Sequence, residues 1–204
     1  MKKILVLVAV ATLLAGLLAF GRSRHAAPSK PIASGYTVDF TVVENGELVS
    51  RKKRQVKANG DFLEETDHLN ADGSVSKHTR LAGTLTGGAQ VIDDARKKLT
   101  FLGRAGLITA VTEAELRAQK DYNRDDLLLG FKVIVQRSCD EQKRCTEYWV
   151  APELGSDDLK VDIDFGDGHR LTTEAVKVVK GEPSFQIPDY PVEQGSRLAN
   201  PGRP

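Results

Sequence analysis

The chain has 204 residues, with 29 Lys and Arg against 28 Asp and Glu and a net charge of +1. This balance excludes a general electrostatic attraction to nucleic acid or to an anionic surface, so a charged partner would have to meet a local patch. Once a targeting segment and tails are subtracted, the length leaves room for one domain.

The amino terminus reads as an export signal, because Met1, Lys2 and Lys3 precede an uncharged apolar run over residues 4–20. Residues 1–21 are either a signal peptide cleaved after Gly21 or a retained membrane anchor through residues 4–20, and both alternatives stay open. No cysteine lies near this segment, which excludes a lipid-modified amino terminus. In either case we expect the body of the protein in the periplasm or elsewhere in the cell envelope.

The two ends of the remaining chain lack an apolar period. Residues 22–35 are small, basic and proline-containing, and we interpret them as a linker. Residues 193–204 are expected to form a flexible carboxy-terminal tail. The folded domain is therefore predicted over residues 36–192.

The pattern of this domain is that of antiparallel strands. Tyr36, Val38, Phe40 and Val42 alternate with polar residues, which sends one set toward a core. Hairpin turns are predicted at five pairs of residues: Asn45-Gly46, Asn59-Gly60, Asp72-Gly73, Gly87-Gly88 and Asp167-Gly168. Further strands are predicted over 47–58, 61–69, 74–82, 89–93, 98–102, 130–138, 145–151, 159–165 and 169–179.

One segment predicts a helix. Thr112 and Glu115 form a capping box ahead of good helix formers, and the helix ends near Lys120 or extends to Leu128. A single helix interrupting an antiparallel sheet indicates an α+β fold, mainly β, in which one short helix packs on the sheet.

Cys139 and Cys145 are the only cysteines, and they are expected at the facing ends of two strands. In an exported protein paired cysteines favour a disulfide, which would stabilise this short loop by roughly 2 kcal/mol. A zinc site would need about four ligands, and a redox site favours a C-x-x-C spacing, neither of which is present.

Two other stretches invite a functional reading. The sequence VDIDFGDGH, residues 161–169, resembles a calcium loop, but its spacing is off by one residue, so a strand followed by a turn explains it better and no metal site is predicted. The run Arg51 to Arg54 could bind phosphate or lipid headgroups. Strand alternation divides its four charges between two faces, which favours a charged edge strand instead.

No catalytic motif is present, and the four histidines occupy linker, strand or turn positions. We therefore expect neither an enzyme nor a cofactor.

Two stretches near the carboxy terminus carry a resemblance. EYWVAPELG, residues 147–155, and GEPSFQIPDYPVE, residues 181–193, resemble the closing strands of uncharacterised exported bacterial proteins. Their domain is similar to the LolA-like half-barrel of lipoprotein carriers and outer-membrane lipoprotein-sorting proteins. The resemblance spans most of residues 36–192 and implies a curved antiparallel sheet, a half-barrel meander, whose concave face binds acyl chains or other apolar molecules.

The resemblance also implies which residues would line such a face. They are Phe40, Val42, Leu102, Phe131, Val133, Val135, Trp149, Val150 and Phe165, with Leu107, Ile108 and Leu116 as a cover. It transfers no catalytic residue. The leading hypothesis is a non-catalytic envelope module for a lipid, a lipoprotein or another apolar ligand. The alternative is a membrane-anchored structural or interaction protein with a packed core and an envelope protein as partner.

Overall fold

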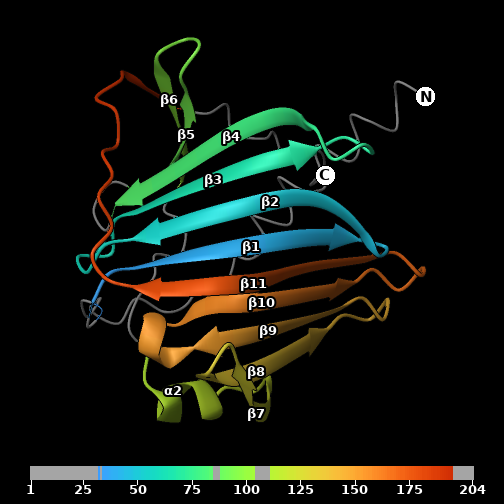
Figure 1. Ribbon diagram of the computed structural model, residues 1–204. Helices are drawn as coiled ribbons and strands as arrows, with labels where there is room; N and C mark the ends of the chain where they lie inside the picture. Colours follow the sequence, from blue (N-terminus) through green and yellow to red (C-terminus); the bar gives the residue numbers. More distant parts are fainter. Residues whose placement is uncertain (1–31, 33, 85–87, 104–110, 195–204) are drawn as a thin grey trace, which may run out of the picture.

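The computed structural model describes residues 32, 34–84, 88–103 and 111–194. These residues form twelve strands, one short α-helix and one 3-10 helix (Figure 1). The first group of strands is β1 (Tyr36–Glu44), β2 (Glu47–Val56), β3 (Phe62–Leu69), β4 (Val75–Thr84), β5 (Gly88–Asp93) and β6 (Lys98–Gly103). After them come α2 (Glu113–Arg117), β7 (Tyr122–Leu128), β8 (Phe131–Cys139), β9 (Cys145–Ala151), η1 (Pro152–Leu154), β10 (Asp157–Asp164), β11 (Arg170–Lys180) and β12 (Val192–Gln194).

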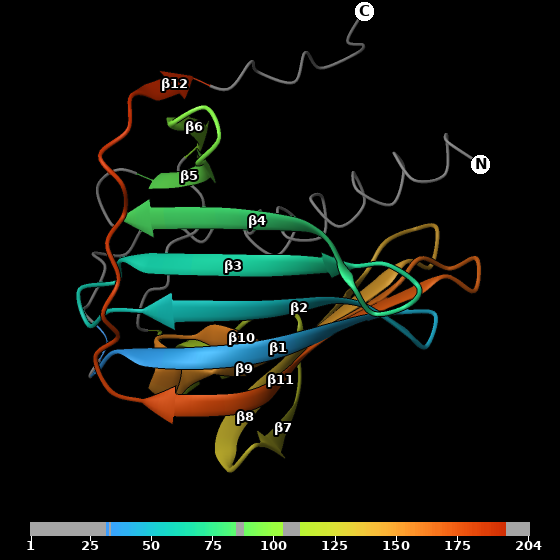
Figure 2. The same cartoon turned by 45° about the horizontal axis from the view of Figure 1, so that its top comes forward.

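All twelve strands belong to one open, curved sheet with the order β12-β6-β5-β4-β3-β2-β1-β11-β10-β9-β8-β7. Two meanders, β1 to β6 and β7 to β11, are joined because β1 pairs antiparallel with β11. Every other pairing is also antiparallel except that of β12 with β6. The expected mainly-β architecture, a curved antiparallel sheet with one short helix, is confirmed (Figures 1 and 2).

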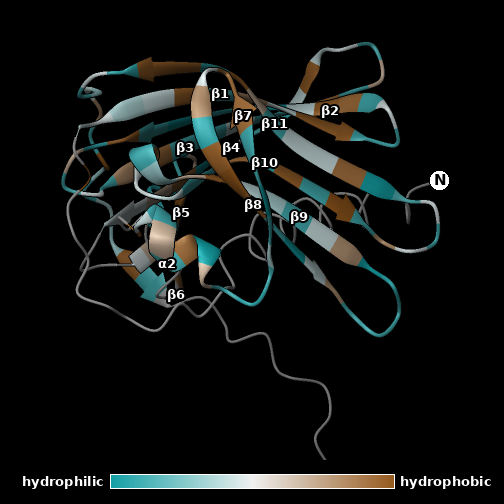
Figure 3. Cartoon of the chain, turned by 90° about the horizontal axis from the view of Figure 1, so that it is seen from below, coloured by the Kyte–Doolittle hydropathy of each residue, from teal (hydrophilic) through white to brown (hydrophobic). Residues whose placement is uncertain are grey.

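The alternation of β1 explains its place in the core. Tyr36, Val38, Phe40 and Val42 are all buried, whereas the residues between them are only partly covered. At the end of β1, Asn45 and Gly46 have φ angles of 51° and 89°, which are the values that a two-residue hairpin turn requires. Hydrophobic and hydrophilic residues alternate along the strands in the same way in Figure 3.

The predicted helix begins where the capping box places it. Thr112 Oγ1 accepts a hydrogen bond from Glu115 N at 3.2 Å, and Glu115 Oε2 accepts one from Thr112 N at 2.7 Å. The extension to Leu128 is wrong, since α2 ends at Arg117 and β7 follows. Leu129 and Gly130 both have positive φ angles, so they form a tight turn that pairs β7 with β8.

Strand β8 is covered on both faces. Val133 and Val135 belong to the main core cluster, which also contains Tyr36 and Val38. Their neighbour Ile134 points the other way and packs with Leu116 of α2 and Val150 of β9. The short helix therefore gives this part of the sheet a second buried layer, which accounts for the continuous apolar run in β8.

After β11, residues 181–191 cross the strand ends and lead to β12 (Figure 2). This crossing segment is fixed by a hydrogen bond from Gly181 N to Gly35 O of 2.9 Å and by one from Lys57 Nζ to Phe185 O of 3.0 Å. Phe185, Ile187 and Tyr190 pack against a cluster formed by Leu63, Ala82, Ile92 and Leu99. The second stretch that carries the family resemblance thus joins both sides of the sheet.

The expected export segment, residues 1–21, lies outside the described residues, as does nearly all of the linker. Within the described part of the chain, no helix is long and apolar enough to cross a membrane. Strand β12 includes Glu193 and Gln194, the first two residues of the predicted tail.

Candidate functional site

A cavity of about 650 Å³ lies against the sheet, lined by side chains from β1 to β6, β10 and β11. Its apolar wall comes mainly from the strands at the junction of the two meanders. The residues of this wall include Phe40, Val42, Val161, Ile163 and Leu171. Leu81, Val91 and Leu102 add apolar surface on the side of β4 to β6.

A polar stripe crosses β2, β3 and β4 between these apolar surfaces. Ser50 lies opposite His68, which in turn lies opposite Lys77. One step along the strands, Lys52 lies opposite Thr66, and Thr66 lies opposite Thr79. All six residues line the cavity. Because Val42 pairs with Ser50 and Phe40 with Lys52, the polar stripe directly adjoins the apolar wall of β1.

At one end of the stripe, a network of ion pairs is built around Arg54. Its Nε and Nη2 donate to Glu64 Oε2 at 2.8 and 2.6 Å, and its Nη1 donates to Asp157 Oδ1. Lys52 Nζ lies 3.2 Å from Glu64 Oε1, and Tyr36 OH donates to Asp157 Oδ2 at 3.0 Å. Since β1 and β11 separate β2 from β10 in the sheet, the Arg54–Asp157 pair connects strands that are not neighbours.

These contacts determine the ionisation of the network. Burial by itself raises the pKa of Glu64, but Lys52 and Arg54 outweigh this effect and lower the pKa to about 2. Burial likewise lowers the pKa of Arg54, yet the carboxylates of Asp157 and Glu64 raise it overall. Burial and the adjacent Asp157 carboxylate raise the pKa of Tyr36 well above its usual value. The network is therefore charged and fully paired near neutral pH.

His68 occupies the middle of the polar stripe. Its Nδ1 lies 3.3 Å from Ser50 Oγ, and its Nε2 lies 3.4 Å from Thr79 Oγ1. Burial lowers the pKa of His68, and the positive charges of Lys77 and Lys52 lower it further. The imidazole is thus neutral at neutral pH and close to two cations.

The charged run of residues 51–54 lies on an inner strand of the sheet and not on the expected edge strand. Lys52 and Arg54 face the cavity, and Arg51 and Lys53 are exposed, so the predicted alternation is confirmed. The prediction of an edge strand is wrong, because β2 lies between β1 and β3. The two inward cations are accommodated in the middle of the sheet because Glu64 and Asp157 pair with them.

The residues expected to line an apolar site divide into three groups. Phe40, Val42 and Leu102 line the cavity. Leu107 and Ile108 lie outside the described residues. The others do not line the cavity in the described structure, and they are Leu116, Phe131, Val133, Val135, Trp149, Val150 and Phe165.

The third group lies mostly in the packed regions around β8 and β9. Val133 and Trp149 belong to the main core cluster, against which Phe131 packs, and Leu116 is fully buried beside Ile134. The Trp149 ring also lies 5.1 Å from Lys160 Nζ, and its Nε1 donates to Asp126 Oδ2 at 3.4 Å. Strand register explains why Trp149 is not part of the cavity lining. Trp149 pairs with Lys160 of β10, and it is the next residue of β10, Val161, that lines the cavity.

Phe165 lies in the turn between β10 and β11, where its ring stacks on His169 with centroids 4.5 Å apart. The surrounding aspartates act as turn residues: Asp164 Oδ1 accepts from Gly166 N, and Asp167 Oδ1 accepts from His169 N, both at 2.9 Å. Among the described residues, no group of three or more His, Cys, Asp or Glu side chains could hold a metal ion.

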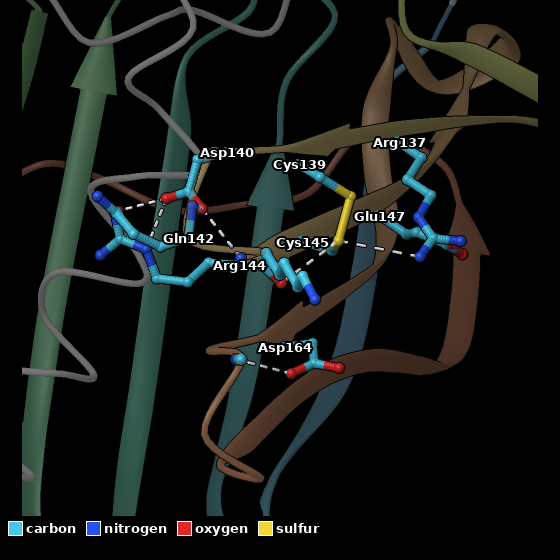
Figure 4. The surroundings of a disulfide bond; sticks show 10 residues. Arg137, Cys139, Asp140, Gln142, Arg144, Cys145, Glu147 and Asp164 are labelled. Atoms are coloured by element: carbon cyan, nitrogen blue, oxygen red, sulfur yellow. Dashed lines mark hydrogen bonds and ion pairs between the residues drawn. A yellow bond between two sulfur atoms is a disulfide. The ribbon is translucent and has the colours of Figure 1, made fainter.

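The predicted disulfide is confirmed between Cys139 and Cys145, which pair directly across β8 and β9 with Cα atoms 4.1 Å apart (Figure 4). Asp140 orders the enclosed loop. Its Oδ1 accepts hydrogen bonds from Gln142 N at 3.0 Å and from Arg144 N at 2.9 Å, and its Oδ2 accepts from Arg144 Nε at 2.6 Å. The bridge closes an exposed hairpin tip and does not line the cavity.

Sequence reasoning missed the ion network and the polar stripe. Alternation within residues 50–56 and 62–68 could have placed Ser50, Lys52 and Arg54 on one face, with Glu64 and His68 on the facing strand. The role of Asp157 could not have been found in this way, because its contact with Arg54 depends on how the sheet curves.

Searches found no matching family model and no matching curated protein. Among solved structures, an uncharacterised conserved protein from Thermus thermophilus matches with a TM-score of 0.48 and 9% identity, over 80% of this chain and 91% of that one. MucB matches with a TM-score of 0.44 and 13% identity, over 78% of this chain and 58% of MucB. The lipoprotein LppX from Mycobacterium tuberculosis matches with a TM-score of 0.33 and 13% identity, over 73% of this chain and 88% of LppX.

Sequence identity is low in all three matches and every TM-score lies below 0.5, so the likeness supports no statement about the family, a ligand or an activity of this chain.

Proposed function

We propose that this protein is a non-catalytic binding module of the cell envelope that holds a lipid, the acyl part of a lipoprotein or another largely apolar ligand. The cavity carries the proposal. Its volume of about 650 Å³ lies within the range of about 300–1,000 Å³ that is typical of small-molecule sites. Phe40, Val42 and Leu171 supply apolar surface for a chain, and the adjoining polar stripe supplies groups that can orient one end of it.

The chemistry of the lining favours binding over catalysis. Glu64 is ionised far below neutral pH and is held by Arg54 and Lys52, whereas a general acid or base works best with a pKa near the working pH. At the rim, Asp94 is likewise held by Arg80 at 2.9 Å. Glu64 is therefore suited to shaping a site and not to transferring a proton.

The envelope location rests on two features. The apolar run over residues 4–20 is typical of an exported or anchored chain, and the Cys139–Cys145 disulfide suits an oxidising compartment. The mass of the mature chain distinguishes the two fates of the amino terminus. A chain beginning at Arg22 is a cleaved and released protein, and a chain that keeps residues 4–20 is anchored.

The test is to purify the full chain gently from a bacterial envelope and to analyse it by native mass spectrometry with lipid extraction. We expect a stoichiometric lipid or other apolar molecule. The purified protein should also bind a fluorescent fatty acid. A folded protein that carries nothing and does not bind the probe would contradict the proposal, and would favour a packed scaffold with a protein partner.

A pair of matched variants locates the bound molecule. Val91→Trp introduces a large side chain at a partly buried position that lines the cavity, so it should weaken probe binding by about tenfold or more. Val179→Trp makes the same change at an exposed position on β11 that is not part of the lining, so binding should equal that of the parent protein. Circular dichroism on both variants checks that each is folded. Equal binding by the two variants would place the probe outside the cavity.

A further inference from the structure

The polar stripe of the cavity contains more cations than the adjacent carboxylate, Glu64, can match. Lys77 and His68 are directly opposite on β4 and β3, and Ser50 is directly opposite His68 on β2. Lys52 is one diagonal step from His68 on the same face. Two lysines and one imidazole therefore meet in one part of the cavity, with the hydroxyl groups of Ser50 and Thr79 beside the imidazole.

Apart from the contact of Glu64 with Lys52, the carboxylates that line the cavity are engaged away from His68 and Lys77. Glu64 belongs to the network around Arg54, and Asp158 lies on β10 next to Asp157 of that network. Arg54 lies four residues from Ser50 along β2, which corresponds to about 13 Å. At the other side, Asp94 pairs with Arg80, and Asp93 accepts a hydrogen bond from Arg96 N at 3.0 Å.

Lys52 and Lys77 thus retain capacity for another acceptor. Lys52 has three donors and meets one carboxylate oxygen, that of Glu64, at 3.2 Å. Lys77 contacts no carboxylate within the described part of the chain. The same proximity explains the pKa of His68, because after burial the largest influences that lower it are the charges of Lys77 and Lys52. Both cations therefore act on the same small volume.

We propose that the ligand of this cavity is an amphiphile with an anionic headgroup, a phosphate or a carboxylate. The headgroup lies between Lys52, His68 and Lys77, and the apolar chain lies along Phe40 and Val42, which are adjacent to Lys52 and Ser50 in the sheet. Ammonium groups and hydroxyl donors are common partners of both headgroups, which they bind through charge-assisted hydrogen bonds. This inference rests on the proposed function, because it assumes that the cavity takes up an apolar chain.

The experiment compares single-chain amphiphiles that share one alkyl chain and differ in headgroup. An alkyl phosphate, a fatty acid, a neutral monoacylglycerol and an alkyl trimethylammonium ion each compete with the fluorescent fatty acid on the full chain. We expect the two anions to bind about tenfold or more tightly than the neutral compound, a difference of about 1.4 kcal/mol, and the cation to bind most weakly. The preference should decrease as salt is added.

Substitutions of single lysines test where the headgroup lies. Lys77→Gln should reduce the preference for the anions severalfold and leave binding of the neutral compound nearly unchanged. Lys52→Gln should reduce the same preference, but it also removes a partner of Glu64, so its effect is measured as the ratio of anion to neutral binding in protein that circular dichroism shows to be folded. Lys77 is exposed, so its replacement does not endanger the fold. Lys53→Gln is the matched control, because Lys53 belongs to the same strand as Lys52 and is exposed outside the cavity lining.

The outcomes separate this inference from the proposed function. If the neutral compound binds as tightly as the anions, the headgroup assignment is overturned and the apolar cavity stands. If Lys53→Gln has the same effect as Lys52→Gln, the assignment is also overturned, because general charge then explains the preference. If inorganic phosphate alone displaces the probe as well as the alkyl phosphate does, the site binds a small anion and not an amphiphile. If none of the four amphiphiles competes, the proposed function itself fails.

Discussion

The two meanders of this sheet use the same strand geometry for different purposes. In β2 and β3, the face toward the cavity carries Lys52, Arg54 and Glu64, which are mostly buried and paired with one another. In β8, Val133 and Ile134 are buried on opposite faces, one in the main core and one beneath α2. A space with polar groups is thus retained over the first meander and the adjoining β10 and β11, whereas β8 is packed on both faces.

If the proposed function holds, the comparison indicates how the fold divides stability from binding. The packed meander gains from the burial of apolar surface on both faces. The cavity meander has to retain charged groups inside the sheet, and it does so by completing a network that includes Asp157 of the other meander. Removing one member of that network should therefore affect both properties, whereas a change beneath α2 should affect stability alone.

The largest effect is expected for Glu64→Gln. The substitution leaves the cations Arg54 and Lys52 short of one carboxylate, which should lower the free energy of unfolding by about 3–5 kcal/mol. Urea denaturation at neutral pH measures this change. Asp61→Asn, at an exposed turn where Asp61 contacts Asn59, is the control and should change stability little. Equal stability of Glu64→Gln and the parent protein would show that the network contributes little.

The same substitution predicts a change in pH dependence. Because the pKa of Glu64 is lowered to about 2 in the folded protein, its ionised form stabilises the fold fully above the ordinary pKa of 4.5. This contribution is lost as the pH falls from about 4.5 toward 2. Glu64→Gln should therefore have a flatter acid limb in a plot of unfolding free energy against pH. Parallel acid limbs in the two proteins would contradict the ionisation assigned to Glu64.

A slightly smaller effect is expected for Leu116→Ala in the packed meander. Leu116 is fully buried against Ile134 and Val150, so its truncation should lower the free energy of unfolding by about 2–4 kcal/mol. Leu127→Ala is a matched control, since Leu127 is 69% exposed, and it should change stability by less than about 0.5 kcal/mol. Probe binding by folded Leu116→Ala should equal that of the parent protein. A loss of binding would show that the two meanders are not separate in function.

The smallest effect is expected at the hairpin tip. Replacing Cys139 and Cys145 together by serine should lower stability by about 2 kcal/mol, because the bridge closes a short loop. Thiol labelling of protein taken from the envelope gives a direct check. Two reactive thiols in the absence of reductant would contradict the disulfide. A change in ligand affinity in the double variant would contradict the conclusion that the disulfide lies outside the cavity lining.

Local patterns in the sequence were sufficient to predict most strands and turns of the fold. The alternation from Tyr36 to Val42 predicts β1, and Asn45-Gly46 predicts the turn after it, because both depend on neighbours along the chain. Thr112 and Glu115 predict the start of α2 for the same reason. β7 escaped prediction, since its turn consists of Leu129 and Gly130, and a leucine at positive φ carries no turn signal.

Most residues of the candidate site could not be predicted from local patterns, because their positions depend on contacts between segments far apart in the sequence. Phe40 and Val42, which were expected on the concave face of the sheet, lie in the cavity wall, because β1 has a regular alternation in the middle of the sheet. The residues around Trp149 in β9 alternate in a similar way. The pairing of β10 with β9, however, shifts register between Asp158 and Lys160, and this shift changes which residues of β10 beside Trp149 face the cavity. No periodicity in the sequence predicts such a shift or the meeting of Arg54 with Asp157.

The pairing of β1 with β11 has a consequence for the order of folding. Tyr36 lies opposite Lys180, so the first strand obtains one of its two partners only when nearly all of the described chain is available. Contacts so distant in sequence form slowly, and until they form, one edge of β1 is open to other strands. A chain that crosses a membrane unfolded, starting from its amino terminus, would therefore assemble this sheet only after translocation is almost complete. The joint between the two meanders thus leaves the first half of the sheet with an unpaired edge until the second half is present.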